Sequence, residues 1–240
     1  MSRAILIARR ELRAYFRSPL GAVVIASALL LDGILFYWRS LSQRLLSGEA
    51  LAEYFWWTSG VTITAALFLS MRLVAEERQT GTFTLLNTAP LRESEIILGK
   101  YLSVLVMVLL LTVLSVYMPL LLLVNGKVSL GHIVVGYLGQ LLLGGAAAAI
   151  GLFASTLTRS QLVSIVVGAA IVVVMLVFWV LAQAIDPPLN KYLAAAALHH
   201  SNFRPFQFGI LELGAVAYYL SVAYLFLLGA VKILEARRWR

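Results

Sequence analysis

The stretch that decides the fold is residues 161–185, QLVSIVVGAAIVVVMLVFWVLAQAI, which contains no Asp, Glu, Lys or Arg. A helix needs about 20 mostly apolar residues to cross the hydrocarbon core of a bilayer. Backbone groups in lipid must bond within their own segment, so this stretch predicts a transmembrane helix. Five further stretches meet the same requirement, and the six predicted spans lie at about 20–38, 54–74, 101–124, 133–157, 161–185 and 213–231.

The composition of the chain is that of a membrane protein. Of its 240 residues, 61% are hydrophobic and 12% are charged, whereas an ordinary globular protein has roughly 25% charged residues. This excludes a soluble, disordered or collagen-like protein. The chain has no cysteine, which excludes disulfides and thiolate metal sites.

The basic residues indicate how the spans are oriented. Six spans put both termini on one side, and cytoplasmic loops carry an excess of Lys and Arg. On the side of the termini fall Arg3, Arg9, Arg10, Arg13, Arg17, Arg72, Arg78, Arg92, Lys100, Arg159, Lys232, Arg237, Arg238 and Arg240, against Arg39, Arg44, Lys127, Lys191 and Arg204 on the other. Both termini are therefore predicted to be cytoplasmic. Most of the net charge of +8 is assigned to this face, and no nucleic-acid partner is expected.

Residues 1–18 predict an amphipathic helix lying in the inner membrane interface. Arg9, Arg10 and Arg13 fall on one arc of such a helix, and apolar residues occupy a separate arc. The arginines are expected to face anionic lipid headgroups. Two interpretations remain open: a simple positive anchor, or a mechanical elbow against which other parts push. At the outer ends of the first two spans, an aromatic belt is expected from Trp38, Tyr54, Trp56 and Trp57.

The loop at 76–100 is the one sizeable loop on the cytoplasmic side. Gly81 and Pro90 bracket about two helical turns, and Phe83 and Leu86 lie on one face of that short helix. Such a helix either lies on lipid headgroups or docks into the groove of a partner. Docking is favoured because an anionic leaflet would repel the four flanking glutamates, Glu76, Glu77, Glu93 and Glu95.

At this loop the chain resembles the membrane permeases of ABC transporters of the type-2 exporter class. The similar run comprises Glu77, Gly81, Thr82, Leu85, Leu86, Pro90, Leu91, Glu95, Ile96, Gly99 and Lys100. Two further stretches agree: the turn at 151–161, and the residues around the last span from Phe203 to Trp239, which are similar to the gliding-motility-type subgroup.

The resemblance implies an all-α integral membrane protein, a single ABC-2-type transmembrane domain over 1–240. It has six transmembrane helices, an N-terminal amphipathic interfacial helix, a short cytoplasmic coupling helix between the second and third, and an outer re-entrant or interfacial segment before the sixth. The bacterial inner membrane is the expected location. The coupling helix, at about 81–89, would dock on a separate ATPase through Glu77, Gly81, Thr82, Phe83, Leu85, Leu86 and Pro90.

The sequence independently supports a separate ATPase subunit. A phosphate-binding loop needs Gly-x4-Gly-Lys-Ser/Thr, but the two Gly-Lys pairs here are followed by Tyr101 and Val128. ATP and Mg²⁺ are therefore expected on the partner ATPase, with no cofactor, catalytic residue or metal site in this chain.

Three functions are considered. The first is an exporter subunit that forms the substrate pathway by alternating access, with a second copy or a homologous permease. The second is a membrane anchor through which an ATPase acts on an extracytoplasmic subunit or complex. The third is a secondary carrier, which would show internal repeats and charged, broken helices near mid-membrane; neither is evident in the sequence.

Polar and small residues within the spans are further candidates. Asp32 lies in the first span, where it pairs with a neighbouring helix, lines the substrate pathway or stays neutral. Small residues cluster in the fourth span and favour close packing within the subunit over a dimer contact. Pro119 is expected to kink the third span.

The segment at 186–212 is too short to cross the membrane. Its first part, from Leu189 to Leu198, is rich in alanine and favours a helix. An interfacial helix or a cap over an outer exit is expected. Adjacent histidines point apart on a helix, so His199 and His200 are not expected to bind a metal.

Overall fold

The structure, a computed structural model, describes residues 3–41, 46–81, 92–126 and 128–238. Within these ranges the regular elements are all helices, and six of the helical segments are long and apolar enough to cross a membrane. The protein is therefore an all-α integral membrane protein, as the sequence predicts.

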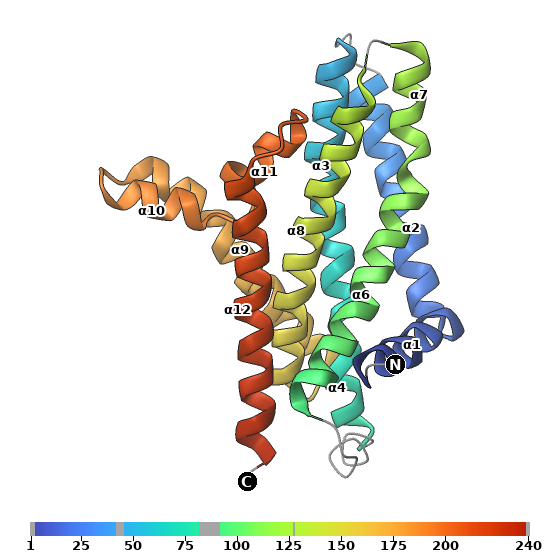
Figure 1. The fold of residues 1–240 in the computed structure, drawn as a ribbon, viewed down its shortest axis with the longest axis vertical. Coiled ribbons are helices and arrows are strands. Elements are labelled where there is room, and N and C mark those ends of the chain that lie inside the picture. The colour runs from blue at the N-terminus through green and yellow to red at the C-terminus, as the bar shows by residue number, and fades with distance from the viewer. Residues whose placement is uncertain (1–2, 42–45, 82–91, 127, 239–240) are drawn as a thin grey trace.

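The six spans are continuous or nearly continuous helices (Figure 1). They comprise α2 (Pro19–Leu35) with the π-helical η1 (Phe36–Leu41), α3 (Ser47–Ser70) with α4 (Arg72–Gln79), α6 (Glu93–Ser115) with α7 (Tyr117–Asn125), α8 (Leu130–Leu157), α9 (Gln161–Ala184) and α12 (Leu213–Arg238). The second and third spans begin earlier than predicted because polar first turns extend them. The carboxylates of Glu49 and Glu95 accept hydrogen bonds from the backbone N–H groups of Leu46 and Arg92, which would otherwise lack helical partners.

The N-terminal helix α1 (Arg3–Arg17) lies across one end of the bundle rather than along it (Figure 1). Pro19 follows it at the first position of α2, where the missing N–H costs no helical hydrogen bond. Both termini lie at this end, which we call the terminal end.

Helix α8 forms the centre of the bundle and packs against α3, α6, α9, α11 (His200–Gln207) and α12. Its small residues make this possible, since Gly136 faces the ring of Phe55 and Gly144 faces Thr62 and Val108. The run Ala146–Ala149 is fully buried. The small-residue face of the fourth span thus serves packing within the subunit.

The third span is interrupted one turn before Pro119. Helix α6 ends at Ser115, four residues before Pro119. A proline within a helix has no N–H to donate to the carbonyl four residues earlier, and its ring clashes with that carbonyl. The hydroxyl of Ser115 is 3.1 Å from that of Tyr137, which is 3.2 Å from that of Tyr54. The interruption at Val116 thus lies where Pro119 is expected to disturb the helix, and polar groups from three spans meet beside it.

At the opposite end, residues 186–212 form two short helices rather than one. Helix α10 (Leu189–Ala196) projects sideways from the bundle and has no buried residue (Figure 1). Helix α11 is anchored by Phe203 and Phe206, which are fully buried. The Tyr219 hydroxyl donates to the carbonyl of Leu198 at 3.0 Å and joins the segment to α12.

The predicted aromatic belt is correct only in part. Tyr54 is buried in the core, with its ring edge-on to Phe36 at 5.6 Å. Trp56 is half-buried and its ring lies 4.3 Å from that of His199. Trp38 and Trp57 remain exposed, and the guanidinium of Arg39 lies over both rings.

Candidate functional site

The candidate site is a cluster of buried ion pairs where α1, α4 and α6 meet at the terminal end. It consists of two acids and two bases, Arg10 and Glu11 of α1, Glu77 of α4 and Lys100 of α6. We call these four residues the ion cluster.

Lys100 lies at the centre of the ion cluster, and its side chain is fully buried. Its Nζ is 3.0 Å from Oε1 of Glu11 and 2.9 Å from Oε2 of Glu77. It also donates a hydrogen bond to the carbonyl of Leu73 near the start of α4. One ammonium group therefore joins three segments that are far apart in the sequence.

Arg10 completes the ion cluster from its exposed edge. Its Nη2 is 2.7 Å from Oε1 of Glu11 and 2.5 Å from Oε1 of Glu77. Each carboxylate is thus shared by two cations, and the four formal charges cancel. Such compensation is needed because removing a single charge from water costs several kcal/mol.

The electrostatics of Glu11 follow from this arrangement. Burial favours the neutral form of the carboxyl group, but the charge of Lys100 and the hydrogen bonds from Arg10 and Lys100 outweigh it. The pKa of Glu11 is consequently lower than its usual value of 4.5. The two neighbouring cations thus stabilise the ionised form of the Glu11 carboxylate.

Close backbone contact brings α1 to Lys100. A Cβ atom on the neighbouring Gly99 would lie 2.7 Å from the carbonyl oxygen of Ala4 and 2.7 Å from Cβ of Ile7. Since one of these obstacles is backbone, α1 would have to move to make room. Glycine at this position lets Glu11 reach the ammonium group of Lys100.

The joint between α3 and α4 is held by α8. The Ser155 hydroxyl accepts hydrogen bonds from the backbone N–H groups of Val74 (3.1 Å) and Ala75 (2.9 Å), and it donates to the carbonyl of Met71 (2.8 Å). Three hydrogen bonds of one side chain thus tie α8 to the start of α4 and to the residue that precedes it. Arg78 adds a hydrogen bond to the carbonyl of Thr156.

The aromatic end of α1 contacts the same joint. The buried hydroxyl of Tyr15 donates to the carbonyl of Leu69, and the guanidinium of Arg72 lies 4.8 Å from the centre of its ring. Arg72 also donates to the Ser18 hydroxyl at 3.0 Å, between α1 and α2. Helix α1 is therefore fixed at two points, through Glu11 to α6 and through Tyr15 to α3.

The predicted docking residues are described only in part. Glu77 belongs to the ion cluster, so its carboxylate is engaged within the chain. Gly81 follows α4 with φ of +76°, in the left-handed region that suits glycine where a helix ends. Thr82, Phe83, Leu85, Leu86 and Pro90 lie outside the described residues.

The three predicted interfacial arginines have different environments. Arg10 is part of the ion cluster, whereas Arg9 and Arg13 are exposed on the outer side of α1. The expectation that all three face lipid therefore does not describe Arg10, whose guanidinium turns toward Glu77.

Asp32 is 3% exposed in α2, and its Oδ1 has no hydrogen-bond partner among the described residues. The pairing with a neighbouring helix that one interpretation requires is thus not found in the described part of the chain.

The two adjacent histidines are used in packing. The ring of His199 stacks on Phe203, and its Nε2 is 2.6 Å from the Ser59 hydroxyl. Burial lowers the pKa of His199 to about 4. The ring of His200 lies 3.7 Å from that of Trp179. Histidine, tryptophan and phenylalanine together fasten α11 to the spans.

Sequence reasoning missed Glu11, Lys100 as its partner, and Ser155. One signal was present, because Glu11 lies four residues from both Ile7 and Tyr15 and so occupies the apolar stripe of α1. A carboxylate on a buried stripe requires a cation, but the sequence alone does not say which one.

The chain was then compared with known proteins. A family model described as "ABC-2 family transporter protein" matches residues 7–232. No curated protein sequence matches the chain significantly. The match begins within α1 and includes the whole ion cluster.

Proposed function

Since the chain belongs to the ABC-2 family of transporter proteins, and is thus a permease component of an ABC transporter, we propose that it works with separate ATPase subunits to export a substrate. The observation that carries the mechanical part of this proposal is the ion cluster. It connects both helices that flank residues 82–91 to the N-terminal helix.

The ATPase docks at residues 82–91 in this proposal. Helix α4 leads into this segment and α6 leads out of it. A displacement of the segment moves Glu77 and Lys100 together, because they pair with each other and are held to adjacent residues of α1, Glu77 to Arg10 and Lys100 to Glu11. Ser155 and Arg78 carry the displacement into α8, the central helix. Closure of the ATPases would thus move α1 and the bundle core in a single step.

The permease acts as a pair, with a second copy or a homologous chain. Helices α2, α9 and α12 have mostly exposed apolar surfaces, which lipid or a partner subunit must cover. A pathway between two such subunits would alternate between inward and outward openings. Asp32, whose buried Oδ1 has no hydrogen-bond partner among the described residues, is a polar group from which such a pathway can be lined.

The terminal end faces the cytoplasm of a bacterial cell in this proposal, and the membrane is the inner membrane. The excess of Lys and Arg at that end supports the orientation. Helices α10 and α11 then lie at the outer face, where α10 is available to an extracytoplasmic subunit.

The proposal is tested by purifying the tagged full chain from its own cells and identifying a copurifying ATPase with a Walker-A motif. The double variant Phe83→Asp/Leu86→Asp is expected to abolish that association, because two charges enter the apolar face of the predicted docking helix. Membrane insertion should stay normal.

The matched control is Thr84→Asp/Thr88→Asp, which adds the same two charges to the opposite side of the predicted helix. It should retain the ATPase. Retention by the Phe83/Leu86 variant, or equal loss in both variants, would refute docking through this face. Reconstitution into proteoliposomes then separates export from membrane anchoring, since only an exporter moves a substrate across the bilayer when ATP is added.

A further inference from the structure

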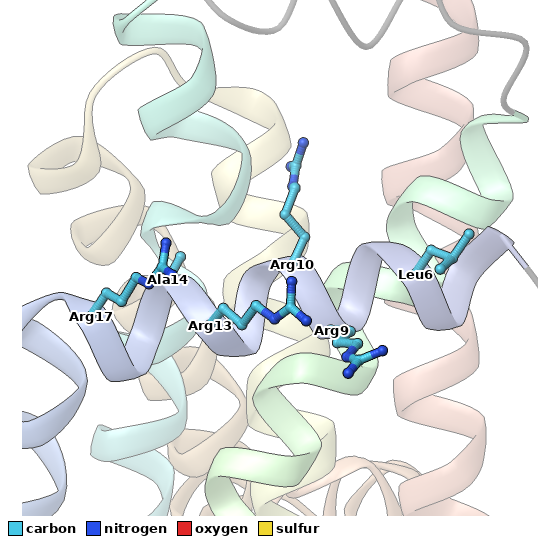
Figure 2. A pocket seen from close by; sticks show the side chains of 6 residues that line it. All are labelled: Leu6, Arg9, Arg10, Arg13, Ala14 and Arg17. Carbon is cyan, nitrogen blue, oxygen red and sulfur yellow. The ribbon is translucent and has the colours of Figure 1, made fainter.

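The outer side of α1 carries a groove rich in arginine. Its volume is about 490 Å³, and its lining residues are Leu6, Arg9, Arg10, Arg13, Ala14 and Arg17. Among the residues that the structure describes, no acidic side chain takes part in the lining. Figure 2 shows that the side chain of Arg10 points away from those of Arg9 and Arg13, in keeping with its place in the ion cluster.

The other three arginines of the groove have no counter-ion in the part of the chain that the structure describes. Arg9, Arg13 and Arg17 are exposed, and among the described residues none of them pairs with a carboxylate. They are spaced four residues apart, about 6 Å along the helix. Like charges at this spacing repel one another and destabilise the helix. These three residues form an arginine stripe, and the stripe therefore favours an anion that binds between the guanidinium groups.

Apolar side chains beside the stripe identify the kind of anion. Ile5 is 46% exposed and Phe16 is 68% exposed on α1, and Leu6 in the groove itself is 53% exposed. An acidic protein surface or a free phosphate ion would leave these side chains in water. A phospholipid places its phosphate against arginines and its acyl chains against neighbouring apolar residues. Since α1 lies across the terminal end of the spans (Figure 1), it is at the depth of the headgroups.

We propose that Arg9, Arg13 and Arg17 bind the phosphate group of one anionic phospholipid of the adjacent leaflet. Guanidinium groups bind phosphate oxygens through paired N–H donors, which an ammonium group cannot do. The lipid is a structural ligand of α1 and not the exported substrate, so this site goes beyond the proposed function. The bound lipid holds the outer side of α1. The inner side of the same helix carries Arg10 and Glu11, which belong to the ion cluster.

The test uses the full chain in detergent micelles, with bound lipids counted by native mass spectrometry during titration with phosphatidylglycerol or phosphatidylcholine. The wild type should bind one phosphatidylglycerol about tenfold more tightly than phosphatidylcholine, as charge-assisted hydrogen bonds imply. Arg9→Gln/Arg13→Gln should lose this preference. The matched control Arg3→Gln/Arg159→Gln removes the same charge from the same side and should keep it.

A second variant distinguishes loss of the lipid site from misfolding of the protein. Arg9→Lys/Arg13→Lys keeps the charge of α1 and should fold, yet it should lose most of the preference because lysine lacks the paired donors. An unchanged preference in this variant would overturn the proposal, as would the absence of any preference in the wild type or an equal loss in the control. Displacement of the lipid by excess inorganic phosphate would show that the groove binds free phosphate instead. If the glutamine variant kept its lipid but lost the copurifying ATPase, the groove would be a protein-docking surface.

Discussion

The ammonium group of Lys100 lies 3.0 Å from the carboxylate of Glu11, a residue 89 positions earlier in the chain. The contact is buried and joins an interfacial helix to the first turns of a span. Because Glu77 shares the same ammonium group, the two helices on either side of residues 82–91 and the N-terminal helix form one electrostatic unit. Variants of these residues therefore test how a displacement of residues 82–91 would be transmitted to the bundle.

Replacing Lys100 by methionine should destabilise the protein strongly. The variant leaves Glu11 and Glu77 with Arg10 as their one cation in the ion cluster, and loss of one member of a buried ion pair typically costs about 3–5 kcal/mol. The measurement is the free energy of unfolding in mixed micelles.

Lys232→Met is the matched control for this variant. Lys232 is 66% exposed and pairs with Glu235 on the surface of α12, so no measurable change is expected. The double variant Glu11→Leu/Lys100→Met should recover part of the loss, because it removes the uncompensated charge. If Lys100→Met proved as stable as the control, the ion cluster would not have the structural role assigned to it.

The contribution of Glu11 should depend on pH in acid. Its folded-state pKa lies below the usual 4.5, so the folded state binds fewer protons than the unfolded state in this range. The resulting stability is complete above about pH 4.5 and is lost as pH falls through the lowered pKa. The stability difference between the wild type and Glu11→Gln should therefore shrink below about pH 4.5. A difference that stayed constant down to pH 3 would contradict the assignment.

Alanine at position 99 should separate α1 from α6. The new Cβ would meet the backbone oxygen of Ala4 at 2.7 Å, and overpacking of this kind costs about 1–3 kcal/mol. Gly60→Ala is the control, since nothing lies within 4 Å of a Cβ there; it should be neutral or slightly stabilising, as alanine favours helix over glycine. Thermal unfolding in the same detergent distinguishes the two.

Loss of the Ser155 hydroxyl should weaken the joint between α3 and α4. In Ser155→Ala, two buried backbone N–H groups lose their acceptor, at a cost of about 1–3 kcal/mol. Hydrogen exchange at Val74 and Ala75 should rise accordingly. Ser27→Ala removes an exposed hydroxyl that bonds its own helix and should leave exchange unchanged. Protection that persisted at Val74 would show that α8 does not hold the joint.

The six spans are predictable because hydropathy alone determines them, and residues 161–185 illustrate this. Their polar ends are less predictable. Helix α3 starts at Ser47 since Glu49 accepts a hydrogen bond from the backbone N–H of Leu46, the residue that caps the helix, and such local hydrogen bonds do not alter hydropathy. Tyr54 was assigned to the interface by residue type, whereas packing against Phe36 places it in the core.

Individual residues of the candidate site were predictable from the sequence, but their association in one cluster was not. Arg10 was assigned to lipid and Glu77 to the ATPase, because the sequence shows each on a charged surface segment. The structure brings the two within 2.5 Å of each other. That proximity depends on how α1 crosses the bundle, which is fixed by Gly99 and the apolar stripe of α1. No local pattern in the sequence encodes this crossing.

The long separation between Glu11 and Lys100 has a consequence for biogenesis. A chain is made from its N-terminus, so α1 and the first two spans leave the ribosome before Lys100 exists. During that time the carboxylate of Glu11 lacks the central cation of its native site. Helix α1 can therefore take its final place only after α6 has been inserted, and insertion of the third span completes the N-terminal half of the molecule.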